Sequence, residues 1–145
     1  MKTIFTLFCI FCGTCAYAQT AWLTVLGDRD DPAVNTIEVD PVPVAVSEGL
    51  RTMRVRVSRS RDRTSWDGVP YRSYVSEVVF DCASRTARYS SLAFYRQALW
   101  GGEPHSTAVY TKANPRPMQF VDVNPNPTAR IIRAACQTGN VQVNE

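Results

Sequence analysis

The chain is poor in the residues that most catalytic and metal sites use. It has one histidine, His105, and residues 19–145 contain two cysteines and no CxxC pair. Structural zinc needs four such ligands, so we expect no metal site. His105 lies in the loop-like segment GGEPHST, and Ser106 is its neighbour in sequence only, which does not supply the geometry of a catalytic triad. We therefore expect no catalytic residues and no cofactor.

A hydrophobic run long enough to span a bilayer, about 20 residues, is also missing. One short apolar run, IFTLFCIFC at residues 4–12, follows the positive Lys2, and residues 16–18 (AYA) supply small residues two apart. Positive charge, short apolar core and small-residue cleavage site together are typical of a secretory signal peptide. We predict a signal peptide over residues 1–18 and a single exported domain over residues 19–145.

Removal of that segment leaves Cys82 and Cys136 as the cysteines of the exported chain. An even pair in an oxidising compartment predicts a disulfide, with two unpaired buried thiols as the alternative. Closing a loop of this length contributes about 4 kcal/mol in the chain-entropy model. Neither Cys12 nor Cys15 follows the small and aliphatic residues of a lipid-attachment signal, so we expect a mature chain without a lipid anchor, with an anchored chain as the alternative.

The chain has no large excess of positive over negative charge, since its formal net charge is only +3. We therefore expect no nucleic-acid partner for this exported chain. The bases are unusual in kind, because all except Lys2 and Lys112 are arginine. Arginine forms bidentate hydrogen bonds with carboxylate, phosphate and sulfate, which favours a protein or an anionic polysaccharide as ligand.

Alternating apolar and polar residues indicate β-strands along most of the chain. We predict strands in residues 21–26, 35–40, 51–57, 71–82, 87–98 and 106–112, with a short extended piece at 118–121. The prolines of residues 41–46 (PVPVAV) favour an edge strand or an extended connection, and residues 47–49 a turn. The apolar parity shifts between Tyr89 and Phe94, which a β-bulge would explain.

The last element is predicted to be a helix. Asn126 is a good N-cap, Pro127 suits the first helical position, and Gly139 is a natural stop. The apolar stripe consists of Ile131, Ile132, Ala135 and Cys136. The predicted fold class is α+β: an antiparallel β-sheet of about five or six strands with a C-terminal helix packed on one face and one disulfide.

Residues 51–63 (RTMRVRVSRSRDR) contain six arginines and are the strongest candidate for a binding site. Met53, Val55 and Val57 alternate with arginines and should point inward from a strand, while SRSRDR continues it as an exposed segment. The candidate ligand-binding residues are Arg54, Arg56, Arg59, Arg61 and Arg63.

The alternative is that this stretch presents only the polar face of a strand. Arg54 and Arg56 would then pair with Glu38 and Asp40 of a neighbouring strand, each pair contributing about 0–1 kcal/mol. Trp66 and Tyr71, beyond the run, would either stack on a ligand or fill the core. The residues alone leave both interpretations open.

Several short motifs resemble a known family when they are taken in order. They are a tryptophan soon after the expected cleavage site, FDC at residues 80–82, Arg85 and Arg88, Tyr95, and NPNPTARIIRAAC at residues 124–136. The combination resembles the surface-adhesin protein E-like domain of Gram-negative bacteria, best over residues 71–136 and more loosely over 22–60. The resemblance implies an antiparallel sheet with a C-terminal helix held by the disulfide, outer-membrane association, and binding of host matrix or plasma proteins.

We therefore expect an exported bacterial envelope protein that is a non-catalytic binding or adhesion module for host matrix proteins or anionic glycans. Its expected location is the periplasm or the cell surface. The alternative is a periplasmic structural or accessory domain that contacts another envelope protein. No ligand-binding residue is carried over from the family, because the arginine run lies where the resemblance is weakest.

Overall fold

The computed structural model of the protein describes residues 21–138, so the expected signal peptide and the helix stop at Gly139 lie outside the described residues. The strands are β1 (Leu23–Leu26), β2 (Thr36–Val39), β3 (Ala45–Ser47), β4 (Leu50–Thr64), β5 (Pro70–Asp81), β6 (Thr86–Tyr95), β7 (Ser106–Val109) and β8 (Arg116–Pro117). A short 3-10 helix η1 (Ala98–Trp100) precedes β7, and α1 (Thr128–Thr138) closes the described chain. The α+β class is confirmed.

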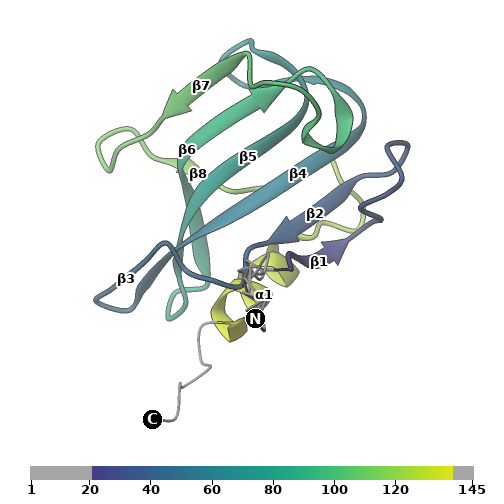
Figure 1. The fold of residues 1–145 in the computed structure, drawn as a ribbon. Helices are drawn as coiled ribbons and strands as arrows, with labels where there is room; N and C mark the ends of the chain where they lie inside the picture. The colour runs from purple at the N-terminus through teal and green to yellow at the C-terminus, as the bar shows by residue number, and fades with distance from the viewer. Residues whose placement is uncertain (1–20, 139–145) are drawn as a thin grey trace, which may run out of the picture.

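The strands form one 8-stranded antiparallel sheet in the order β1-β2-β4-β5-β6-β7, with β3 on β4 and β8 on β6 (Figure 1). Our estimate of about five or six strands was too low. The extra strands include β3, of 3 residues, and β8, of 2 residues. Such short strands leave little alternation in the sequence, and β8 lies just before the extended piece that we expected at 118–121.

The centre of the sheet is the long pair β4 and β5. Met53 pairs with Val78 and Val57 with Tyr74 in the register, so the inward residues of both strands meet on one face. That alternation buries Met53, Val57 and Val78 completely. The predicted inward face of the arginine-rich strand is therefore correct, and β4 continues beyond its last valine to Thr64.

A bulge shifts the pairing between β5 and β6, as the change of parity along β6 predicted. Glu77 pairs with Ser91 but Val78 pairs with Tyr89, so Ser90 is the extra residue. The Ser90 hydroxyl donates to the Glu77 carbonyl at 3.1 Å. The bulge lets Tyr89 and Phe94 both face the core despite their opposite parity.

The predicted turn at residues 47–49 joins β3 to β4. Glu48 and Gly49 have φ angles of 49° and 79°. A two-residue hairpin turn of this kind requires left-handed conformations at both central positions, which is where glycine costs least. The turn therefore forms at the residues where the sequence predicted it.

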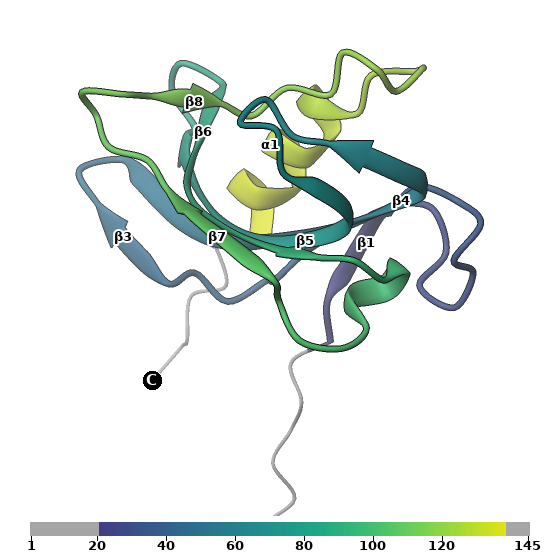
Figure 2. The same cartoon turned by 90° about the horizontal axis from the view of Figure 1, so that it is seen from above.

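α1 lies against the concave side of the curved sheet (Figure 2). The Asn126 side-chain oxygen accepts hydrogen bonds from the backbone N–H and the hydroxyl of Thr128, at 3.0 and 2.7 Å, as expected of an N-cap. Ile131 and Ala135 are fully buried, which confirms the predicted apolar stripe. In the described region no helix is both long and apolar enough to cross a membrane.

The predicted disulfide joins the end of β5 to the last turn of α1. Cys82 and Cys136 are bonded with Cα atoms 5.8 Å apart and a sequence separation of 54. Arg51 of β4 donates to the carbonyls of Ala135 and Cys136, at 3.4 and 3.0 Å. Carbonyls at a helix C-terminus lack backbone partners within the helix, so Arg51 satisfies the Cys136 carbonyl and shares the Ala135 carbonyl with the Thr138 hydroxyl.

Two tyrosines pair inside the core between β5 and β6. Tyr74 and Tyr89 are 5% and 2% exposed, and their hydroxyl oxygens lie 2.8 Å apart in a hydrogen bond. Burial raises the pKa of both hydroxyls well above 10, because a phenolate there would lose its hydration, and for Tyr74 the neighbouring Tyr89 raises the pKa further.

Removing the disulfide is expected to destabilise the protein strongly. Replacing both Cys82 and Cys136 with alanine should lower the free energy of unfolding by about 4 kcal/mol, because the unfolded chain regains the entropy that the 54-residue link removes. Urea denaturation followed by tryptophan fluorescence measures the change, with the native protein under a reductant as the matched control. An unchanged denaturation midpoint in both samples would contradict the structural role given to the bond.

The buried tyrosine pair predicts a loss of stability at alkaline pH. The folded-state pKa values of Tyr74 and Tyr89 exceed the unfolded value near 10, so their contribution is complete below about pH 10 and declines as the pH rises further. The free energy of unfolding should therefore stay constant with respect to these two groups up to about pH 10 and fall progressively at higher pH. The Tyr74→Phe/Tyr89→Phe double variant should show a clearly smaller fall, and an equally steep fall would assign the effect to other groups.

Candidate functional site

The five predicted arginines do not share one face of β4. Arg54 and Arg56 lie on the face away from the core, where Arg54 pairs with Asp40 at 3.9 Å and Arg56 with Glu38 at 2.5 Å. The register places Glu38 directly opposite Arg56. The pairs that we considered as the alternative interpretation therefore form, and they occupy these two arginines within the protein.

Arg56 belongs to a dense structural cluster around Glu38. Glu38 is fully buried, and its carboxylate also accepts from the Thr24 hydroxyl and pairs with Arg29, each at 2.9 Å. The Arg56 guanidinium lies 4.3 Å from the ring of Trp22 and 4.0 Å from that of Trp100. A guanidinium held between two indoles and a buried carboxylate has little freedom to take up an external ligand.

The segment that carries Trp100 is held in an unusual backbone conformation. Leu99 and Trp100 have φ angles of 52° and 60°. Their backbone N–H groups donate to the hydroxyls of Ser58 and Ser73, at 2.9 and 3.0 Å, and the indole N–H of Trp100 donates to the Tyr74 carbonyl at 3.0 Å. These bonds hold the indole against Arg56. No local sequence pattern indicates this role of Trp100.

The other three predicted arginines line one small polar pocket, which we call the arginine pocket. Its volume is about 160 Å³, and its lining residues are Asn35, Arg59, Ser60, Arg61, Arg63 and Asp122. The pocket lies where the far end of β4 meets the connection between β8 and α1. The lining therefore contains three arginines and one acidic residue, so the pocket has an excess of positive charge.

Asp122 connects two of these arginines through one oxygen. Its Oδ2 accepts from Nη2 of both Arg59 and Arg63. Arg61 is exposed and forms no ion pair within residues 21–138. A single carboxylate cannot neutralise three guanidiniums, and an added carboxylate or sulfate would be attracted to the remaining charge.

Arg59 departs from the expectation that SRSRDR is an exposed continuation of the strand. The residue is 4% exposed, and Ser58 before it is fully buried. The reason is that β4 keeps its alternation past Val57, so Arg59 points to the core side, where Asp122 meets it. Its Nε is buried and has no hydrogen-bond partner within the described part of the chain.

A second cleft, of about 230 Å³ and lined mainly by aromatic and apolar residues, shares Arg59, Arg63 and Asp122 with the arginine pocket. Tyr71 packs against Tyr74 and Phe94 with ring centroids 5.6 and 5.4 Å apart, so it fills the core. Burial raises the pKa of Tyr71, and the nearby positive charge of Arg59 opposes that rise. Of the two roles considered for Tyr71, stacking on a ligand or filling the core, the structure shows the second.

Trp66 lies at the rim of the same cleft and is 48% exposed. Its ring stacks against Tyr89 at 5.7 Å, and its indole N–H donates to the Tyr110 hydroxyl at 3.0 Å. The Arg116 guanidinium lies 5.6 Å from the Trp66 ring. Trp66 therefore fixes the loop between β4 and β5 over the cleft, while part of its ring stays accessible.

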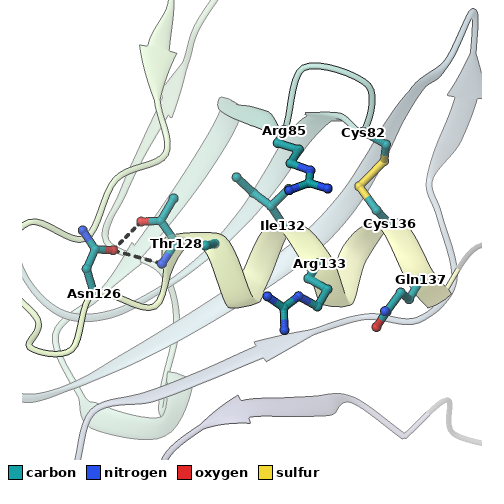
Figure 3. Close-up of a pocket in the computed structure, with 9 residues that line it drawn as sticks. Cys82, Arg85, Asn126, Thr128, Ile132, Arg133, Cys136 and Gln137 are labelled. Carbon is teal, nitrogen blue, oxygen red and sulfur yellow. Dashed lines mark hydrogen bonds between the residues drawn. A yellow bond between two sulfur atoms is a disulfide. The ribbon is translucent and has the colours of Figure 1, made fainter.

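A larger cavity lies elsewhere, beside the disulfide, and we call it the helix pocket (Figure 3). Its volume is about 710 Å³, and it is lined by Cys82, Arg85, Asn126, Thr128, Ala129, Ile132, Arg133, Cys136 and Gln137. Arg85 extends from the turn between β5 and β6 toward α1, and Arg133 extends from the helix itself. Sequence reasoning singled out Arg85 as a family feature but not as part of a cavity.

His105 lies in the loop before β7 and is exposed. Its backbone N–H donates to the Phe94 carbonyl at 2.9 Å, and within the described chain its imidazole has no hydrogen bond or ion pair. In the same residues no group of three or more His, Cys, Asp or Glu side chains is arranged to hold a metal ion.

Comparison with known proteins identifies the family. A family model described as surface-adhesin protein E matches residues 22–137, which include the whole sheet and both disulfide cysteines. No curated protein and no solved structure matches the chain. The resemblance predicted from FDC and from residues 124–136 is thereby confirmed, and it supports a general role in adhesion with an exported or surface location. The chain belongs to the surface-adhesin protein E family.

Proposed function

We propose that this protein is an exported, non-catalytic adhesion module that binds host matrix proteins or anionic glycans through their carboxylate or sulfate groups. The observation that carries the proposal is the arginine pocket, whose lining contains Arg59, Arg61 and Arg63 and has Asp122 as its one acidic residue. Family membership supports the general adhesive role, and the charge of the pocket supports the class of ligand.

The arrangement of donors in this pocket suits an oxyanion. Arg59 is held rigidly by burial and still has an unpaired Nε, while Arg61 at the exposed rim has no ion pair within residues 21–138. A rigid inner guanidinium loses little side-chain entropy on binding, and an exposed outer one can adjust to the ligand. Of the five predicted arginines, these properties favour Arg59, Arg61 and Arg63 over Arg54 and Arg56.

The absence of catalysis is part of the same proposal. Its support is that the one histidine lies exposed on a loop without a side-chain partner in the described chain. General acid–base catalysis requires a positioned group within hydrogen-bond reach of the reacting atoms, and an exposed loop imidazole has no partner that orients it. A binding function needs only the charge and shape of the surface.

Heparin chromatography tests the arginine pocket. The Arg61→Ala/Arg63→Ala variant should bind heparin about two- to fivefold more weakly per arginine removed, as expected for partly exposed ion pairs. It should also elute at lower salt, because such pairs are screened. Arg54→Ala is the matched control, since Arg54 is exposed on the opposite face and its loss should leave elution nearly unchanged. Equal weakening by the control would remove the assignment to this pocket.

The Asp122→Asn variant should strengthen heparin binding at the same pocket, the opposite of the effect expected for the arginine variant. The change removes the one carboxylate of the lining without altering its shape, so heparin retention should increase while the midpoint of thermal unfolding falls. Melting temperature is measured together with elution so that a loss of folded protein is not read as a loss of binding. Reduced retention of a folded Asp122→Asn protein would show that anions do not bind here.

Protease treatment of intact cells tests the location. We expect a surface-displayed protein to be cleaved while a periplasmic marker in the same cells stays intact. Protection of the protein until the outer membrane is permeabilised would instead place it in the periplasm. That result would favour the alternative of an accessory domain that contacts another envelope protein.

A further inference from the structure

The helix pocket is a second candidate site that does not rest on the proposed function. It extends along α1 from Asn126 to Gln137, includes the disulfide, and shares no lining residue with the arginine pocket. Its volume of about 710 Å³ falls within the roughly 300–1,000 Å³ that is usual for small-molecule sites. The site is therefore large enough for an organic ligand rather than for a single ion.

The charge of the lining indicates the sign of the ligand. The lining includes Arg85 and Arg133 and contains no aspartate or glutamate. Both arginines are exposed, and neither forms an ion pair within residues 21–138. Other arginines of the chain, such as Arg56 and Arg63, are paired with carboxylates. The helix pocket is thus lined by two arginines that have no acidic partner within residues 21–138.

The backbone at Arg85 adds a second observation. Its φ is 57°, in the left-handed region that a side chain bearing a Cβ rarely adopts. The turn around it is fixed by the Asp81 carboxylate, which accepts from the N–H groups of Ala83 and Ser84 at 3.1 and 3.0 Å. In this conformation Arg85 extends toward Ile132 of the helix (Figure 3).

The rest of the lining is partly apolar. Ile132 and Ala129 contribute aliphatic surface, and the Cys82–Cys136 disulfide forms part of the wall. The amides of Asn126 and Gln137 complete the lining, and the Asn126 oxygen is already used by Thr128. A ligand that fits such a site has an oxyanion head for the guanidiniums and an apolar body for the aliphatic and disulfide surface.

We propose that the helix pocket binds a small amphiphilic anion, an aliphatic chain that ends in a carboxylate or a phosphate. The head pairs with Arg85 and Arg133, and the chain lies along Ile132, Ala129 and the disulfide. A carboxylate head would belong to a free fatty acid and a phosphate head to a lipid phosphate. Both ligands combine an anionic head with an aliphatic chain, and the experiment below distinguishes them.

Titration of the oxidised ¹⁵N-labelled protein with octanoate and with octyl phosphate tests the proposal. Either ligand should shift the backbone amides of residues 82–86 and of α1. Octyl glucoside tests the apolar chain without charge, and acetate and inorganic phosphate test the heads without a chain. Bound ligand should also slow reduction of the Cys82–Cys136 bond by dithiothreitol, because the bond lines the pocket. The anion that binds more tightly identifies the source.

The Arg85→Gln/Arg133→Gln variant should weaken binding about tenfold for each arginine removed, since a charge-assisted hydrogen bond is replaced by a neutral one. Both residues are exposed, so the fold should be retained. Arg96→Gln, another exposed arginine, is the matched control and should bind like the native protein.

Three results would each overturn the proposal. They are undiminished binding by the Arg85→Gln/Arg133→Gln variant, equal affinity for octyl glucoside or for the isolated heads, and amide shifts that map away from α1. Heparin retention is measured on the same variant. If this variant loses octanoate binding but keeps its heparin retention, the helix pocket and the arginine pocket are independent sites. A wrong proposal for one pocket can then be told apart from a wrong proposal for the other.

Discussion

The docking of α1 on the concave side of the sheet is the constraint on which the rest of the structure depends. A helix of 11 residues is marginal alone in water, so its stability must come from packing and from its links to the sheet. Ile131 and Ala135 pack into the core, the disulfide holds the last turn to β5, and Arg51 of β4 takes up its terminal carbonyls. Near the other end of the helix, Arg130 donates to the Val25 carbonyl of β1 at 2.7 Å.

Both candidate sites are consequences of that docking. The connection from β8 must cross the end of the sheet to reach the start of α1, and this path brings Asp122 onto Arg59 and Arg63. At the other end, the disulfide fixes α1 beside the turn between β5 and β6, which leaves Arg85 and Arg133 on one cavity. The same packing that stabilises the fold thus concentrates positive charge in two separate places.

The predominance of arginine over lysine has a structural explanation in these contacts. Arg56 stacks between two indoles while it pairs with a buried carboxylate, and Arg51 donates to two carbonyls at once. Both uses need a planar group with several donors in a fixed geometry, which an ammonium group does not provide. A stretch with many arginines in this chain is therefore not by itself evidence of a ligand-binding site, because most of the guanidiniums of β4 form contacts that stabilise the fold.

The sequence by itself determined the features that local chemistry controls. Alternation placed Met53, Val55 and Val57 inward, the parity shift after Tyr89 located the bulge, and Asn126 and Pro127 marked the helix start. The cysteine pair and the motif order then sufficed for the disulfide and the family. Only the tertiary structure decided that Arg59 is buried, that Trp22 and Trp100 enclose Arg56, and that Arg85 and Arg133 share a cavity. The reason is that those contacts join residues far apart in the chain, and sheet curvature, strand register and the path of the connections set their distances.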